Sequence, residues 1–212
     1  MSIEALELAD WRRRIAELYA EVREASERDP RFAWDHWRAT RERLFREHPQ
    51  SPVPAAARAG FRAAHWPYDE RLRFVVAVER VPPAADPAPE ASASMPWSVG
   101  VARQQLALVG RVTLPLPGGA RTLGLFRFDD YAGGLFLPFR DATNGVETYG
   151  AGRYLLDTAK GADLGSDGDR LVIDLNFAYH PSCAFDPRWA CPLAPPESRL
   201  DVRIEAGERL DR

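Results

Sequence analysis

The spacing of apolar positions divides the chain into a helical N-terminal part and a longer part made of strands. Between residues 4 and 25, apolar side chains recur every three or four positions, with Arg and Glu on the other face. That spacing predicts an amphipathic helix. Asp29-Pro30 is typical of a helix start. A second helix carrying Trp34 and Trp37 is expected to follow it and to end before Pro49.

From Arg71 onward the apolar residues come in short runs, which are typical of strands. The runs after the first, which begins at residue 72, are 99–114, 121–128, 135–139, 153–156, 171–177 and 200–204. Gly118-Gly119, Gly133-Gly134 and Asn144-Gly145 separate some of them, and such pairs favour tight hairpins because they accept positive φ. Short strands without intervening helices indicate an antiparallel meander.

We therefore expect an α+β, mainly β fold, with an antiparallel β-barrel or sandwich-like core and two N-terminal helices packed on it. The 212 residues suit a single domain. Residues 1–48 would form its helical part and residues 61–212 its β core. A Pro/Ala-rich loop is predicted at 82–96.

Charge and composition narrow the classes of function. The formal net charge is −3, which argues against a nucleic-acid partner. Lys160 is the only lysine, and this arginine bias suggests a GC-rich bacterial source. Neither a cationic, apolar leader nor a run of about 20 apolar residues is present. We expect a soluble, cytoplasmic protein without membrane contact, and the sequence predicts no oligomeric state.

The densest polar cluster follows the run at 135–139. Arg140, Asp141, Glu147, Tyr149 and Arg153 lie there on a glycine-rich backbone. The two guanidinium groups could clamp a carboxylate or phosphate through paired hydrogen bonds. We predict a pocket lined by these five residues for a small polar or anionic ligand. The alternative is a corner of the barrel in which Arg and carboxylate groups pair internally.

Two further interpretations attach to this pocket. Trp66, in an aromatic segment with His65 and Tyr68, could stack on a ligand at the mouth, although such residues are more often core. Asp141 and Glu147 are the candidate catalytic residues, because a buried carboxylate can act as a general base.

His180, Cys183 and Cys191 are side chains that can hold a metal, and His48 or His65 could join them. Structural zinc sites usually show closely spaced ligand pairs, which are missing here. We weigh a mononuclear metal site or a redox pair against two buried thiols in a proline-fixed loop, and favour the thiols. No metal or cofactor is predicted, and neither a P-loop, a dinucleotide fingerprint nor a G-x-S-x-G motif occurs.

Several segments together resemble the prokaryotic domain-of-unknown-function family numbered 1684. They are WRATRERLFREHPQSPV, HWPYDERLRF, LFLPFRDATNGVETYGAGRYL, DLNFAYHPSCAF and CPLAPPESRL, within a resemblance from Trp11 to Gly207. The resemblance implies no established activity. The family pattern usually has Asn where His180 and Ser198 stand, which weakens His180 as a metal ligand.

Three hypotheses follow for the function. A binding module for a small ligand is favoured, because no nucleophile–base pair is recognisable. The second is a hydrolase- or isomerase-type enzyme that uses Asp141 or Glu147 as general base. The third is a structural or partner-binding protein without a small-molecule site.

Overall fold

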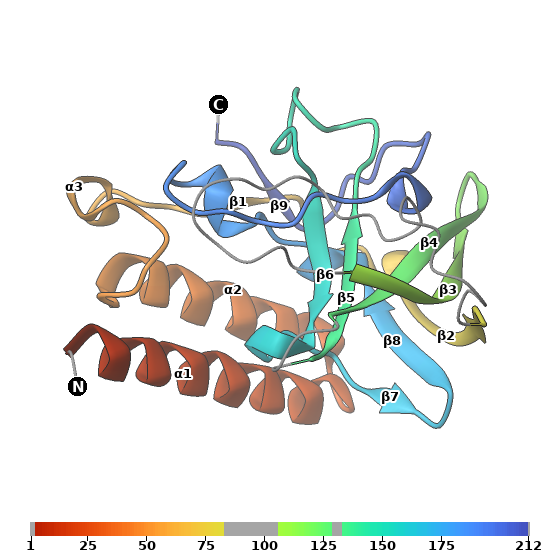
Figure 1. Ribbon diagram of the computed structural model, residues 1–212, viewed down its shortest axis with the longest axis horizontal. Coiled ribbons are helices and arrows are strands. Elements are labelled where there is room, and N and C mark those ends of the chain that lie inside the picture. The colour runs from red at the N-terminus through yellow and green to blue at the C-terminus, as the bar shows by residue number, and fades with distance from the viewer. Residues whose placement is uncertain (1–2, 83–105, 129–132, 212) are drawn as a thin grey trace.

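Two antiparallel helices form the N-terminal part of the computed structural model, which describes residues 3–82, 106–128 and 133–211. Helix α1 (Ile3–Ser26) and helix α2 (Pro30–Glu47) lie side by side (Figure 1). The Asp29 side chain accepts a hydrogen bond of 3.0 Å from the backbone N–H of Phe32 and so caps α2. The two predicted helices are confirmed.

The segment that connects the helices to the sheet is irregular, and it pairs with residues near the C-terminus. A short helix α3 (Ala55–Arg58) is followed by strand β1 (Ala64–His65), which pairs antiparallel with β9 (Glu208–Arg209). Residues near the C-terminus are thereby held beside the segment that leaves the helices.

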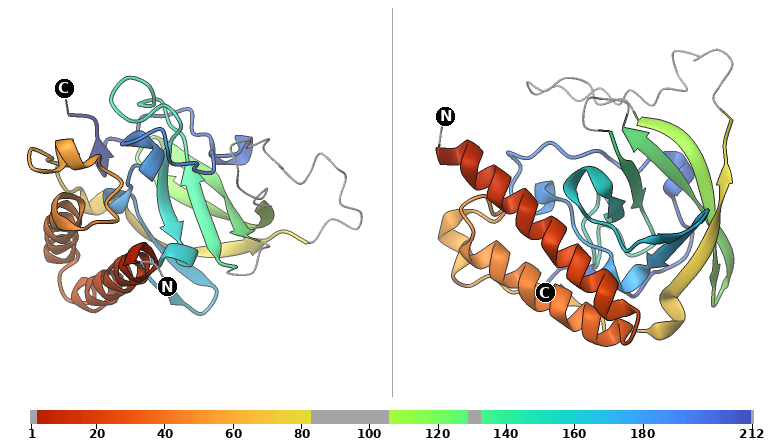
Figure 2. Two further views of the ribbon diagram at one scale, coloured as in Figure 1. Left: turned by 60° about the vertical axis from the view of Figure 1, so that its left-hand side comes forward. Right: turned by 90° about the horizontal axis from the view of Figure 1, so that it is seen from below.

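Seven strands form one curled antiparallel sheet, a half-barrel with the helices lying along one side (Figure 2). The strands are β2 (Arg73–Arg80), β3 (Leu106–Leu116), β4 (Gly119–Phe128), β5 (Leu135–Phe139), β6 (Arg153–Asp157), β7 (Ser166–Asp167) and β8 (Arg170–Asp174). Their order is β6-β5-β4-β3-β2-β8-β7. The expected mainly β fold with two packed helices is confirmed.

Some expected boundaries differ from the structure. The run at 200–204 forms no strand, because its backbone bonds to the loop between β5 and β6: Leu200 N–H donates to Arg140 O at 2.7 Å. The run at 171–177 leaves the sheet after Asp174 and continues as a 3₁₀ turn, Leu175–Phe177. Asn144-Gly145 lies within the long loop that joins the antiparallel strands β5 and β6, so it does not form the tight hairpin turn that was expected. Most of the expected loop at 82–96 lies outside the described residues.

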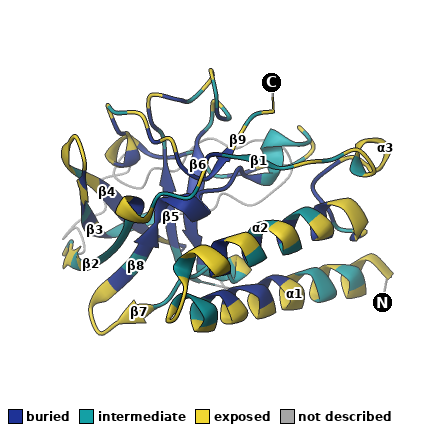
Figure 3. Ribbon diagram, turned by 180° about the vertical axis from the view of Figure 1, so that it is seen from behind, coloured by how far each residue is buried: buried dark blue, intermediate teal, exposed yellow. Residues whose placement is uncertain are grey.

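Strand β6 lies where two hydrophobic clusters meet, and all five of its residues are buried (Figure 3). One cluster joins the helices to the sheet and includes Leu18, Trp37 and Tyr154. The other gathers apolar residues of the sheet with the C-terminal segment, including Leu155 and Ile204. Tyr154 belongs to the first cluster, and Leu155 and Leu156 belong to the second, so β6 packs against both parts of the core.

Candidate functional site

At the start of β6, Arg153 forms an ion pair with Asp141 that is closed to solvent. Both side chains are 0% exposed, and Arg153 Nη2 lies 3.3 Å from Asp141 Oδ1. The same nitrogen donates to Ile204 O at 2.9 Å, and Nη1 donates to Ala206 O and to Glu208 O. We call Arg153, Asp141 and these three carbonyl groups the sealed cluster.

The other bonds of the sealed cluster also run to the protein itself. Asp141 accepts from Thr143 Oγ1 at 2.9 Å and from Ile204 N–H at 2.7 Å. The guanidinium carbon of Arg153 lies 5.3 Å from the Trp66 ring centroid and 5.0 Å from that of Phe139, which favours a buried cation. The cluster ties the β5–β6 loop to the C-terminal segment.

The remaining residues predicted from the sequence are placed apart. Glu147 is partly exposed and pairs with Arg203 at 2.6 Å on the surface. Arg140 is half-buried, and its backbone bonds to Ser198 and Leu200. Trp66 lies in a groove of about 910 Å³ that Arg203 also lines. The structure thus brings Asp141, Arg153 and Trp66 together, while a pocket shared by all six residues stays a prediction.

A second buried ion pair lies between α2 and β9. Arg41 Nε contacts Glu208 Oε1 at 2.6 Å, and His180 N–H donates to Glu208 Oε2 at 2.6 Å. Burial raises the pKa of Glu208, but attraction and hydrogen bonding from Arg41 outweigh it and lower that pKa to about 2. Burial lowers the pKa of His180 to about 4, and its Nε2 accepts from Tyr149 N–H at 3.3 Å. His180 therefore serves as a neutral acceptor in this network.

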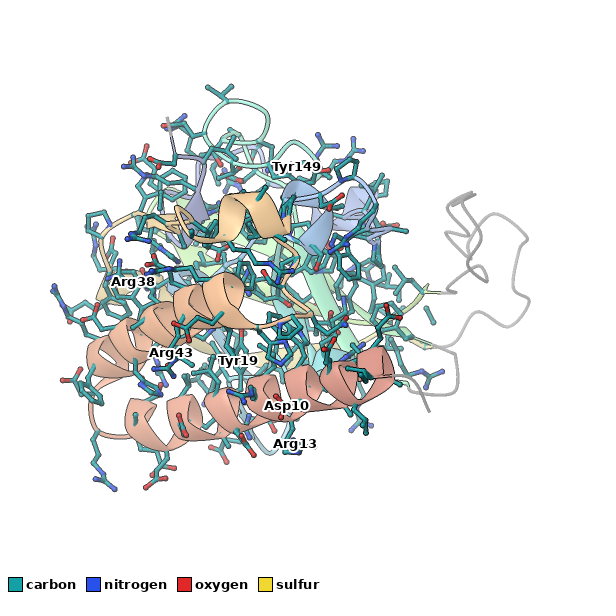
Figure 4. The ribbon with its side chains drawn as sticks, turned by 90° about the vertical axis from the view of Figure 1, so that its left-hand side faces the viewer. Asp10, Arg13, Tyr19, Arg38, Arg43 and Tyr149 are labelled. Atoms are coloured by element: carbon teal, nitrogen blue, oxygen red, sulfur yellow. The ribbon has the colours of Figure 1, made fainter. Side chains whose placement is uncertain are left out.

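At the other end of β6 an open cleft of about 500 Å³ separates α1 from the loop 182–192. We call it the helix–barrel cleft. Its lining includes Trp11 and Arg12 of α1, Asp157 and Lys160 at the end of β6, and Trp189 and Cys191 of the loop. A smaller chamber of about 70 Å³ shares Trp11 and Lys160 and reaches Tyr19 and Arg41. Tyr19 lies between the two helices in Figure 4.

Local contacts hold the walls of the helix–barrel cleft in place. Gly161, at φ +81°, packs against α1 so closely that a Cβ there would lie 3.2 Å from Ala16 Cα. Arg12 Nη1 donates to Ala159 O at 2.9 Å. Tyr154 of β6 donates from its hydroxyl to Pro192 O at 2.5 Å. The cleft is therefore a consequence of α1 packing on the turn after β6.

Two buried polar atoms at this cleft lack partners among the described residues. Asp157 is 1% exposed; its Oδ2 lies 3.1 Å from Lys160 Nζ, but its Oδ1 accepts no hydrogen bond. The Trp189 indole Nε1 likewise donates to no described group. Buried polar atoms are nearly always paired, so two residues that line one cavity and each carry an unpaired polar atom mark it as the candidate site.

Our sequence reasoning missed Asp157, Lys160 and Trp189 as site residues. A signal was present, since the only lysine of the chain stands three residues after a carboxylate that ends a strand. Trp189, in contrast, carried no pattern that would separate it from a surface aromatic residue.

The two thiols connect the β5–β6 loop to the cleft. Cys183 N–H donates to Cys191 Sγ at 3.3 Å. Hydrogen bonds from the Cys191 thiol and the Tyr149 hydroxyl lower the pKa of Cys183. The hydrogen bond between the two thiols, together with burial, raises the pKa of Cys191. Burial and the bond to Cys183 raise the pKa of Tyr149 to about 12. In Figure 4 Tyr149 lies across helix α2 from Tyr19.

No group of three or more His, Cys, Asp or Glu side chains in the described ranges is placed to hold a metal ion. Within those ranges, none of the helices is long and apolar enough to cross a membrane.

The comparisons with known proteins place the chain in a family without assigning it an activity. No curated protein matches it. The solution NMR structure of an uncharacterized protein from Haloarcula marismortui is similar, with a TM-score of 0.56 and 32% identity. The match covers 82% of this chain and 90% of that one. The family described as "Protein of unknown function (DUF1684)" matches residues 61–209, and the chain belongs to this family.

Proposed function

We propose that this protein binds a small polar ligand in the helix–barrel cleft. The observation that carries the proposal is that Asp157 and Trp189 both line one cavity, and that Asp157 Oδ1 and Trp189 Nε1 are buried without partners among the described residues. A ligand with a hydroxyl or amino group could donate to the first atom, and one with an acceptor oxygen could receive from the second. A cavity of about 500 Å³ is within the size range of sites for metabolite-sized molecules.

The lining of the cleft supports a ligand with both apolar and charged parts. Trp11 and Trp189 supply aromatic surface, while Arg12 and Lys160 place two cations near Asp157. The cations could receive an anionic group of the same ligand.

The enzyme alternative gains no support from the placement of its candidate bases. Asp141 has both oxygens engaged inside the sealed cluster, and Glu147 pairs with Arg203 at the surface. Neither carboxylate lines the helix–barrel cleft. A hydrolase or isomerase based on these two residues would need a substrate to displace existing contacts.

A thermal-shift screen tests the proposal. Purified protein would be heated with amino acids, amines, polyols, sugar phosphates and organic acids, alongside Asp157→Asn and the surface control Glu147→Gln. We expect one chemical class to raise the Tm of the wild type and of Glu147→Gln, since binding to the folded state stabilises it by mass action. Asp157→Asn should lose that rise.

Two outcomes would contradict the proposal. A compound that stabilises all three proteins equally binds elsewhere, and a flat screen at millimolar concentrations removes the small-ligand hypothesis in favour of a structural or partner-binding role. Native mass spectrometry of the same samples would show whether a stabilising compound binds with a stoichiometry of one.

A further inference from the structure

The loop 181–192 folds back on itself and brings its two cysteines together. A 3₁₀ turn, Ser182–Ala184, is followed by a turn in which Trp189 N–H donates to Asp186 O at 3.2 Å. Residues eight positions apart thereby meet, with Cys183 N–H donating to Cys191 Sγ at 3.3 Å. Both thiols are free.

The surroundings of the two sulfur atoms differ. Cys191 is buried at 5% exposure within the cluster that joins the helices to the sheet, whereas Cys183 is half-buried and open to small reagents. The groups that act on the Cys183 sulfur are the Cys191 thiol, the Tyr149 hydroxyl and the Lys160 ammonium. The hydrogen bond from the Cys191 thiol lowers the pKa of Cys183 most. Burial opposes this, but Tyr149 and Lys160 add to the lowering, so that the pKa falls to about 7.

A cysteine with a purely structural role would have surroundings different from those of Cys183. A thiol that only fills core space has apolar neighbours, which disfavour the thiolate and make the sulfur inert. Cys191 fits that description by its burial. Cys183 packs against the same apolar cluster but is only half-buried, and the Cys191 thiol beside it favours its thiolate. The arrangement therefore has one sulfur suited to attack and a second sulfur placed to follow.

We propose that Cys183 and Cys191 form a reversible dithiol–disulfide pair in which Cys183 reacts first with a peroxide and Cys191 resolves the product. The Cys183 thiolate attacks one peroxide oxygen, the O–O bond breaks, and hydroxide leaves, which gives a sulfenic acid. The Cys191 sulfur then attacks the Cys183 sulfur. The S–S bond forms, the S–O bond breaks, and the leaving hydroxide takes the Cys191 proton as water. The two sulfurs together lose two electrons, and the peroxide gains them.

This pair is independent of the ligand proposed for the helix–barrel cleft. Of the two cysteines only Cys191 lines that cleft, and the oxidation of the thiols needs a hydroperoxide but no cleft ligand. Sulfur oxidation and ligand binding can therefore fail separately, because the first is measured by the mass of the protein and the second by its thermal stability.

The test is intact-protein mass spectrometry after brief exposure of the reduced full chain to hydrogen peroxide, with iodoacetamide as quench. The wild type should lose the mass of two hydrogen atoms, take up no alkyl group, and recover both thiols with dithiothreitol. Cys191→Ser should instead accumulate a sulfenic acid that dimedone captures at Cys183. Cys183→Ser should react at least about tenfold more slowly, because its remaining thiol is buried and protonated.

Tyr149→Phe separates a reactive pair from a merely adjacent one. Loss of the hydroxyl should move the rise of the wild-type rate with pH to higher pH, an effect that a purely structural tyrosine would not produce. If circular dichroism shows that Cys183→Ser does not fold, the Tyr149→Phe pH profile and the mass of the oxidised wild type still test whether Cys183 reacts first and pairs with Cys191. Uptake of two alkyl groups by peroxide-treated wild type, or equal oxidation rates of the two serine variants, would overturn the proposal.

Discussion

The two ends of strand β6 carry the most instructive contrast in the molecule. Arg153 begins the strand and Asp157 ends it, and both side chains are almost fully buried. Arg153 makes four hydrogen bonds to the C-terminal segment and to Asp141. Asp157 lines a cleft, and one of its oxygens has no partner among the described residues.

The contrast shows that density of charge along the chain and availability of charge in the fold are different properties. The sequence concentrates charged residues around Arg153, yet there Arg153, Asp141 and Glu147 all pair within the protein. Arg153 Nε has no hydrogen-bond partner among the described residues, but the guanidinium group lies close to two aromatic rings. Around Asp157 the charges are fewer, but Asp157 and Lys160 line a cavity. Counting the unmet hydrogen bonds of buried atoms therefore locates a candidate site better than counting charges.

The largest effect is expected from Arg153→Ala. Removal of the guanidinium strands the Asp141 carboxylate and three carbonyl groups in the interior, which should cost about 3–5 kcal/mol of unfolding free energy. Urea unfolding measures it, with Arg203→Ala as the control at an exposed pair, where the midpoint should not move. A loss for Arg153→Ala no larger than for the control would mean that the sealed cluster is not a structural tie.

The second effect concerns acid stability through the Arg41–Glu208 pair. The pKa of Glu208 falls from an ordinary 4.5 to about 2 on folding, so the pair stabilises the folded state above pH 4.5. That contribution, about 3 kcal/mol, is lost as pH falls from about 4.5 through about 2. Urea unfolding at several pH values should show a loss in this window that is smaller in Glu208→Gln. If the unfolding free energies of the two proteins fell in parallel with pH, the pKa of Glu208 would not change on folding.

A smaller effect is expected from Asp157→Asn. Since Asp157 Oδ1 has no partner and Lys160 is half exposed, the unfolding free energy should change by no more than about 1 kcal/mol. Differential scanning calorimetry of the ligand-free protein checks this. A loss comparable with that of Arg153→Ala would make Asp157 a structural residue and remove the difference between the two ends of β6.

The smallest effect is expected from Glu147→Gln. Its partner Arg203 is exposed and also bonds to Glu205, so the substitution should leave the urea midpoint and ligand binding unchanged. A measurable loss of ligand stabilisation in this variant would return the candidate site to the β5–β6 loop, where the sequence first indicated it.

The sequence alone determined the local elements, because their causes are local. A period of three to four apolar residues predicts α1 and α2 wherever they pack, and Gly118-Gly119 predicts the β3–β4 hairpin through backbone conformation alone. The family resemblance was also visible in the segments and is confirmed by the match over residues 61–209.

Only the tertiary structure decided which polar residues remain available. Arg12 reaches Ala159 across 147 positions of the chain, and Arg153 finds the carbonyl groups of Ile204 to Glu208 more than 50 positions away. No periodicity or motif predicts these contacts, because they depend on how the helices pack against the sheet. The same packing satisfies Asp141 and leaves Asp157, which lines a cavity, with one oxygen unpaired among the described residues. The candidate site therefore follows from long-range contacts that no local pattern specifies.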